Sequence, residues 1–254
     1  YYPVFQRREQ RAHSEQYLHG LLSPDIEQKA IEPMMLALEG DDPNEIRAMQ
    51  HFISEGSWDD EAVLRRHWQE VAADLGDEEG VFILDGSEFP KQGSESAGVK
   101  RQYCGQLGKT ANCQAGVFLG YASQKGYTLL DRRLYLPEEW VTDEAYAERR
   151  RKCGIPKDIV FQTKPMLGLE MVQAVLKAGT LPGRWLTMDE GYGRSTVLLD
   201  EVSVLGLWYY AEVPHDTCVW RERPASAVPP WSGRGPKPTR ERLAEGAPAP
   251  STVA

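Results

Sequence analysis

The sequence predicts an α/β fold in which a helical N-terminal region precedes a mixed β-sheet. Residues 6–76 carry helical patterns and few strand signals, whereas apolar runs typical of strands begin just after Gly80. From there the predicted order is three strands, a helical crossover, a fourth strand, a helix and a fifth strand. Because a helical crossover is typical of parallel pairing, this order predicts a layered α/β domain.

Helix-start signals recur in the N-terminal region. Ser23-Pro24-Asp25 and Asp41-Asp42-Pro43 would each place a proline in the first turn of a helix, where its missing N–H costs little. Trp58-Asp59-Asp60 opens a further predicted helix. We interpret its apolar stripe as core packing rather than a ligand site, and the stripe comprises Val63, Leu64, Trp68, Val71 and Leu75.

Two apolar runs each end in an aspartate. In VFILDGSEFPKQG, residues Val81–Leu84 lead into Asp85 and turn-forming residues follow. In RWLTMDEGYG, residues Trp185–Met188 lead into Asp189. Both runs are typical of buried strands that deliver one carboxylate at the exposed strand end. Taken singly, each aspartate is more typical of a turn residue or a helix cap.

Two more strands and two helices are predicted between these runs. A polar, glycine-rich loop spans Gly93 to Asn112, and the turn Gln124-Lys125-Gly126 joins the two strands. The strands are predicted over 114–122 and 127–136, and the helices over 144–153 and 166–178. After the second aspartate we predict a helix over 195–205 and a strand over 207–213.

Composition divides the chain into three parts. We predict a helical region over residues 1–78 with possible DNA-end binding, an α/β core over 79–220, and a tail over 221–254. The tail is rich in Pro, Gly, Ala and charged residues and cannot bury enough apolar surface to fold alone. It is either an extended tail or the lead-in to a missing segment.

Length and residue usage limit the class of protein. With 254 residues the chain can hold one large core or two smaller ones, and because it begins at Tyr1 we expect that it was processed or cut there. No apolar run approaches the roughly 20 residues of a membrane-spanning helix, so we expect a cytoplasmic protein without a membrane partner. The four cysteines lack CxxC spacing, which argues against a zinc site or a disulfide framework.

The net charge of −9 is unfavourable for binding nucleic acid, which depends on clustered Lys and Arg. Positive charge is nevertheless concentrated locally. One group follows the first aspartate and comprises Lys91, Lys100, Arg101 and Lys109. Later clusters are either DNA-binding surfaces or ordinary solvated faces, and they comprise Arg132, Arg133 and residues 149–152.

Two strand-end aspartates that are distant in the sequence suit a divalent-metal site. Hard oxygen ligands must converge on Mg²⁺ from rigid elements, and two metals about 3.5–4 Å apart can hold the attacking and leaving oxygens of a phosphoryl transfer. We therefore predict that Asp85 and Asp189 hold Mg²⁺ or Mn²⁺ together. Glu88 and Glu190 lie nearby in the sequence, and we expect both to be supporting or surface residues rather than ligands.

Three long blocks between and around these runs resemble a known family. They are SAGVKRQYCGQLGKTANCQAGVFLGYAS (96–123), LLDRRLYLPEEW (129–140) and GIPKDIVFQTKP (154–165). The blocks are similar to bacterial DDE transposases of the insertion-sequence branch labelled seven-hundred-and-one. The resemblance runs from near Phe5 to the end of the chain and implies a ribonuclease-H-like fold. It places Asp85 and Asp189 where the family carries the first two acids of its catalytic triad.

The resemblance implies a transposase that cleaves phosphodiesters and transfers DNA strands at insertion-sequence ends. Asp85 and Asp189 would be catalytic and would hold two Mg²⁺ or Mn²⁺ ions in a complete site. The implied partners are double-stranded DNA, at element ends and targets, and further copies of the chain on that DNA. No organic cofactor is implied, and the expected location is the nucleoid. Expected DNA contacts are Lys91, Lys100, Arg101, Lys109 and Tyr192, with Arg7, Arg8 and Arg11 in the helical region.

A glutamate matching the family's third acid is not found in this chain. In the family it lies on a helix beyond the Pro-rich segment, whereas Glu241 and Glu245 lie in a tail without an apolar helical face. We assign the role to neither and expect weak or absent strand transfer. Two alternatives stay open. One is a non-catalytic DNA-binding remnant that occupies element ends, and the other is a different ribonuclease-H-like nuclease acting on hybrids or junctions.

Overall fold

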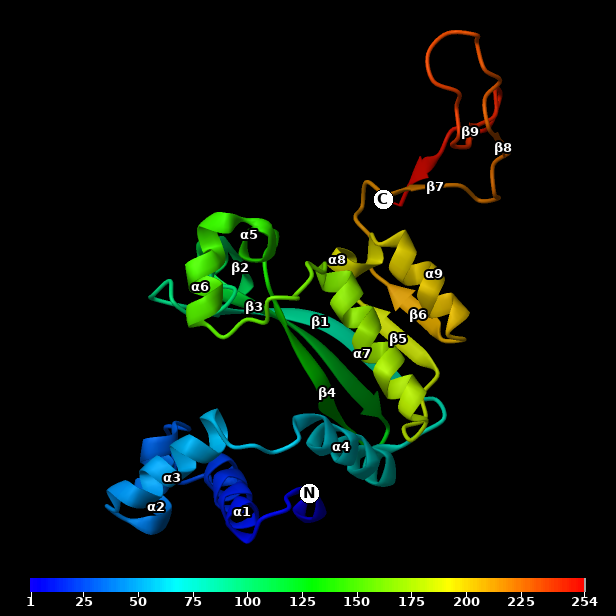
Figure 1. The fold of residues 1–254 in the computed structure, drawn as a ribbon. Helices are drawn as coiled ribbons and strands as arrows, with labels where there is room; N and C mark the ends of the chain where they lie inside the picture. The colour runs from blue at the N-terminus through cyan, green and yellow to red at the C-terminus, as the bar shows by residue number, and fades with distance from the viewer. Residues whose placement is uncertain (254) are drawn as a thin grey trace.

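A mixed sheet of six strands forms the centre of the molecule (Figure 1). The computed structural model describes residues 1–253. The strand order is β2-β3-β1-β5-β6, and β4 pairs with β3. β1 pairs antiparallel with β3 and parallel with β5, and β5 pairs parallel with β6. The strands are β1 (Val81–Pro90), β2 (Lys100–Cys104), β3 (Lys109–Ser123), β4 (Gly126–Tyr135), β5 (Trp185–Met188) and β6 (Trp208–Ala211).

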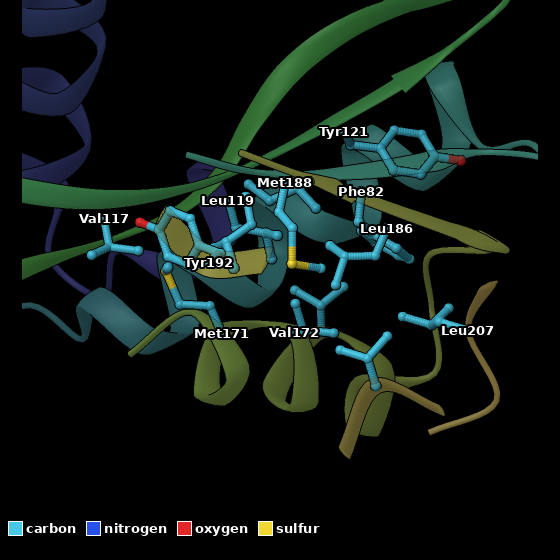
Figure 2. Packing of buried hydrophobic residues seen from close by; sticks show 14 of the residues in the cluster. Phe82, Val117, Leu119, Tyr121, Met171, Val172, Leu186, Met188, Tyr192 and Leu207 are labelled. Carbon is cyan, nitrogen blue, oxygen red and sulfur yellow. The ribbon is translucent and has the colours of Figure 1, made fainter. Parts of the chain in front are cut away.

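Two helices cover one face of the sheet, where the main core lies. α7 (Lys164–Ala178) is the crossover from β4 to β5, and α9 (Thr196–Val204) connects β5 to β6. Their apolar residues pack against alternate residues of β1 and β5, and Figure 2 shows Val172 of α7 beneath Leu186 and Met188. Burying one such side chain contributes about 1.5–3 kcal/mol. The expected ribonuclease-H-like α/β class, with a mixed sheet behind N-terminal helices, is confirmed.

β1 is longer than predicted. The sequence predicted a strand that ends at Leu84 and exposes Asp85 at its tip, but β1 continues to Pro90. Residues 85–90 stay paired with β3, from Asp85 opposite Phe118 to Pro90 opposite Cys113. β5, in contrast, ends at Met188, so β1 extends beyond its parallel neighbour. The turn-forming residues after Asp85 were misleading because the long partner strand holds them extended.

Four helices form the N-terminal region. They are α1 (Arg8–Leu22), α2 (Ile31–Glu39), α3 (Pro43–Ser54) and α4 (Asp60–Leu75), preceded by the short η1 (Tyr2–Val4). Two predicted starts are confirmed, since Asp42 accepts from the Asn44 N–H at 2.8 Å and Asp59 from the Ala62 N–H at 2.9 Å. The predicted start at Ser23-Pro24-Asp25 is wrong. α1 ends at Leu22, shortly before that proline, which cannot continue a helix.

The helical region holds two separate packing clusters. Phe5, Met35, Met49 and Phe52 form a small core among the first three helices. α4 instead joins the main core, because Trp68 and Val71 are buried there. The Trp68 indole N–H donates to the Leu130 carbonyl of β4 at 3.1 Å. α4 is therefore packed as part of the α/β core, although the predicted boundary at residue 78 separates the two.

A small helical lobe follows β4. It contains α5 (Glu138–Thr142), η3 (Glu144–Tyr146) and α6 (Ala147–Lys152), where one helix over 144–153 was predicted. Trp140 is fully buried in this lobe and donates to the Val99 carbonyl at 2.9 Å. The predicted loop over 93–112 is wrong in part, because it includes β2 and η2 (Gly105–Leu107). Pairing of β2 with β3 is long-range and carries no local sequence signal.

The C-terminal segment extends away from the sheet (Figure 1). α8 (Glu190–Gly193) follows β5, and beyond β6 the segment contains two-residue pairings of β7 (Cys218–Val219) with β10 (Ser251–Thr252) and of β8 (Ser226–Ala227) with β9 (Arg242–Leu243). Within residues 1–253, no helix is both long and apolar enough to cross a bilayer.

Candidate metal and DNA-cleavage site

Asp85 and Asp189 lie side by side on neighbouring strands. In the parallel pairing of β1 with β5, Leu84 lies opposite Met188, and each aspartate is the next residue. The backbone of Asp189 stays extended, with φ −77° and ψ 179°. Leu84 and Met188 are buried on the α7 face, so both aspartates point to the opposite face, where both are exposed. Neighbouring strands are about 4.8 Å apart, which places the two carboxylates within reach of one ion.

Each carboxylate is anchored through one oxygen. Asp85 Oδ1 accepts from the Gly86 N–H at 2.7 Å. Asp189 Oδ1 accepts from the Gly191 N–H at 2.9 Å and the Tyr192 N–H at 3.3 Å, and it caps the N-terminus of α8. Among the described residues, neither Oδ2 atom accepts a hydrogen bond. Asp189 is thus a helix cap, which was the alternative interpretation of its sequence, and its second carboxylate oxygen accepts no hydrogen bond from the described residues.

Tyr192 is buried directly behind the site. Its side chain packs with Met171 and Val117, and Figure 2 shows the hydroxyl turned toward Val117. Burial is the main cause of a strongly raised pKa for Tyr192, and the carboxylates of Asp189 and then Asp85 add to it. The hydroxyl therefore stays protonated, and it has no hydrogen-bond partner among the described residues. This burial argues against the predicted contact between Tyr192 and a DNA phosphate, because the ring fills the core beneath α8.

Glu88 and Lys164 join the site in a way the sequence did not reveal. Lys164, in the first turn of α7, lies 3.1 Å from Glu88 Oε1 through its Nζ atom. Glu88 Oε2 also accepts from the Gly105 N–H at 3.3 Å. Glu88 was expected to be a supporting or surface residue, and it is largely enclosed on the α7 side of β1. Lys164 lies in the block 154–165 that resembles the family, but the sequence did not single it out, because its contact with Glu88 spans 76 residues.

The predicted DNA contacts near the first aspartate are spread along the sheet. Lys91, Arg101 and Lys109 are exposed. Arg101 lies opposite Asn112 of β3, and Asp85 lies opposite Phe118. Asn112 and Phe118 are six residues apart, so about 20 Å of strand separates Arg101 from Asp85. An even number of residues along β3 puts both on the same face. Lys100 differs, because its ammonium is paired with Glu139.

Three arginines of the later basic clusters make structural contacts. Arg133 donates to the buried carboxylate of Asp131 at 2.6 Å. The Arg149 guanidinium stacks over the Trp140 ring at 4.8 Å and donates to the Ser94 carbonyl. Arg150 donates to the carbonyls of residues 140 and 143. The guanidinium groups of these three arginines are committed to structural contacts. Arg132, Arg151 and Lys152 are exposed, so for them a solvated face and a DNA surface both stay open.

The donor set fits a divalent cation to a limited extent. Mg²⁺ usually keeps several waters and is held through one or two carboxylates, which is what Asp85 and Asp189 offer. Among residues 1–253 no group of three or more His, Cys, Asp or Glu side chains converges as a metal site. Glu190 is exposed in the first turn of α8, and Glu241 lies next to β9 in the extended tail, far from β1 and β5 in Figure 1. The structure thus brings together two carboxylates.

Comparison with known proteins agrees with this architecture. The whole chain, residues 1–254, matches the family described as DDE superfamily endonuclease, and the protein belongs to that family. A probable transposase for insertion sequence element IS701 from Microchaete diplosiphon is 31% identical over 96 residues. That stretch is 38% of this chain and 24% of the transposase, so the alignment spans about a quarter of the relative. Membership in the family implies use of a divalent metal and DNA as a partner.

Proposed function

We propose that the chain acts as a DNA transposase that cleaves phosphodiesters, and transfers strands, at insertion-sequence ends. The observation that carries this proposal is the exposed pair of Asp85, in β1, and Asp189, the residue directly after the parallel neighbour β5. Family membership supports the reaction class, and the similarity to a probable transposase supports the substrate class.

In this proposal the two aspartates hold Mg²⁺ or Mn²⁺ through their Oδ2 atoms, which accept no hydrogen bond from the described residues, with a second ion in a complete site. The bound ions would lower the pKa of an attacking water or 3′-hydroxyl and stabilise the leaving oxygen. The chain's own residues fix the ligands. The Gly86 N–H orients Asp85, while the first turn of α8 orients Asp189. Such fixed ligands reduce the reorganisation needed in the transition state.

DNA binding is assigned to the exposed basic residues on the extended part of the sheet. Arg101 shares the face of Asp85 about 20 Å away, a distance that suits contacts to phosphates flanking the cut. Lys91 lies at the adjoining end of β1, where its N–H donates to the Asn112 carbonyl. Lys109, at the start of β3, is exposed as well and is the third of these proposed DNA contacts. Lys100 contributes less, because Glu139 neutralises it.

A second candidate is the non-catalytic remnant that occupies element ends. The observation that favours it is the convergence of two, rather than three, acidic side chains among residues 1–253. Two carboxylates hold a metal more weakly than three, so we expect weak or absent strand transfer by this chain. The division into a DNA-end region over 1–78, a core and a tail remains part of the proposal.

The test is metal-dependent nicking of a supercoiled plasmid that carries element ends. We expect nicking in Mg²⁺ or Mn²⁺ that falls more than about 100-fold in Asp85→Asn and in Asp189→Asn, because even outer-shell partners of metals contribute 10–100-fold. Asp200→Asn, at an exposed position in α9, is the matched control. End-specific binding without nicking in any variant would favour the remnant, and preference for RNA–DNA hybrids would favour a different nuclease.

A further inference from the structure

A small polar cluster lies on the α7 side of β1, directly behind Asp85. A Cβ atom built on Gly86 would lie 3.6 Å from the Tyr192 hydroxyl oxygen and 3.7 Å from Lys164 Nζ. Lys164 Nζ is also 3.1 Å from Glu88 Oε1. Both side chains are partly enclosed, with 32% of Lys164 and 19% of Glu88 exposed. One ammonium and one carboxylate therefore lie within a few ångströms of the residue that follows the first aspartate.

The ammonium is poorly placed for a cation site unless its charge is balanced. A unit positive charge near a divalent ion opposes binding, and partial burial leaves this repulsion weakly screened. The N-terminus of α7, where Lys164 lies, adds partial positive charge of the same sign. Glu88 supplies the opposite charge at hydrogen-bond distance, and the Gly105 N–H holds its second oxygen.

The buried Tyr192 hydroxyl connects this pair to the aspartates. It has no hydrogen-bond partner among the described residues, and it lies over Gly86 together with Lys164. The negative charges of Asp189, Asp85 and Glu88 all contribute to its raised pKa, after burial. Glu88 therefore acts on the same small region as the two aspartates.

We propose that Glu88 and Lys164 are positioning residues that set the divalent-cation affinity of the Asp85–Asp189 pair by balancing each other's charge. This inference rests on the proposed function. The ammonium fixes Glu88 between α7 and β1, while Glu88 cancels a charge that would otherwise repel the cation. The two residues have opposite effects on the site, which a purely structural ion pair would not have.

The test is Mn²⁺ binding measured from the signal of free Mn²⁺ in electron paramagnetic resonance titrations of the full chain. Glu88→Gln leaves the ammonium unbalanced, and we expect it to weaken Mn²⁺ binding about threefold to tenfold. Lys164→Met keeps the apolar stem and leaves Glu88 unbalanced, so we expect tighter binding by a similar factor. The double variant should return close to wild-type affinity.

Controls separate local charge from net charge and from folding. Glu79→Gln removes a carboxylate paired with Arg184 about 20 Å away along β1. Lys177→Met removes a lysine from the last turn of the same helix, also about 20 Å away. Both should leave Mn²⁺ affinity unchanged. Thermal unfolding of each metal-free variant confirms that it is folded.

Weaker binding in both single variants, or no change in either, would overturn the charge-balance proposal while leaving the proposed function intact. Asp85→Asn and Asp189→Asn distinguish failure of the charge-balance proposal from failure of the proposed function. Each of these variants should abolish the Mn²⁺ binding that is being measured. If Mn²⁺ binding does not depend on these two aspartates, the proposed function fails and this inference fails with it.

Discussion

At Asp189, one carboxylate oxygen accepts hydrogen bonds from the backbone of α8, and the other accepts none from the described residues. At Asp85, too, only one carboxylate oxygen accepts a hydrogen bond from the described residues, and its donor is the Gly86 N–H. The sequence predicted both residues as ligands, because an apolar run followed by aspartate marks a strand that ends in a carboxylate. It could not predict how Tyr192 lies, since Tyr192 is aromatic and follows a turn signal, and only packing decides whether such a ring faces solvent or core.

Substitution of Tyr192 tests whether its buried hydroxyl contributes to stability. Its hydroxyl is buried without a hydrogen-bond partner in residues 1–253, so Tyr192→Phe removes an unsatisfied polar group and keeps the ring in place. We expect the free energy of unfolding to stay unchanged or to rise by up to about 1 kcal/mol. Urea unfolding followed by circular dichroism measures this difference. A loss greater than about 1 kcal/mol would show that the hydroxyl makes a hydrogen bond in solution.

The ion pair between Lys100 and Glu139 gives a prediction of pH dependence. The hydrogen bond from Lys100 lowers the pKa of Glu139, so the pair stabilises the fold fully above the usual carboxyl pKa of about 4.3. This stabilisation is lost as the pH falls through the lowered value. Glu139→Gln should therefore be less stable than wild type at pH 7, by less than about 1 kcal/mol for so exposed a pair, and the difference should shrink at pH 3. Urea unfolding at the two pH values would contradict the account if the gap widened in acid.

At the scale of elements, local signals located the strands and helices better than their ends. β4, β5, α7 and α9 lie within a few residues of their predicted ranges, because hydrophobic period and turn residues both act locally. β2 was missed and β1 was cut short, because pairing with the long strand β3 decides both. The role of Lys164 was missed for the same reason, because its partner Glu88 lies on an element that is distant in the sequence.

Gly193 shows how closely two elements approach behind the site. A Cβ atom there would lie 2.1 Å from the backbone oxygen of Glu212, which no rotamer change can relieve. We expect Gly193→Ala to lower the free energy of unfolding by about 2–3 kcal/mol. The displaced α8 should also weaken Mn²⁺ binding through Asp189.

Gly93→Ala is the matched control for this change. A Cβ atom at that position meets no atom within 4 Å, and the residue has no positive φ. Its stability should match or slightly exceed wild type, by up to about 1 kcal/mol. Equal stability of the two alanine variants would contradict the close approach of α8 to the end of β6.

At the scale of the whole molecule, burial and charge are distributed in ways that composition does not show. The net charge of −9 does not show that several clustered arginines are committed to structural contacts, while Lys91, Arg101 and Lys109 are exposed near β1 and β2. The α/β class was predictable because strands and helices alternate after residue 80. The boundary at residue 78 stays a prediction. α4 has a helical sequence like its neighbours but differs from them in packing against β4.

A pair of shortened chains tests where the core begins. A chain of residues 57–220 keeps α4, whereas a chain of residues 79–220 lacks the buried Trp68 and Val71. We expect the longer chain to unfold cooperatively and the shorter to lose several kcal/mol, because each buried side chain of this kind contributes about 1.5–3 kcal/mol. A chain of residues 1–220 is the control for removal of the tail and should resemble the full chain. Equal stability of 57–220 and 79–220 in urea would place the boundary at residue 78 after all.

The central claim is that Asp85 and Asp189 hold a divalent cation together. The most direct measurement is the anomalous scattering of Mn²⁺ in crystals of the full chain soaked with that ion. We predict a peak within about 2.0–2.6 Å of an oxygen from each of the two carboxylates, on the side of the sheet opposite α7. A well-ordered site with both carboxylates visible and no Mn²⁺ peak between them would contradict the account.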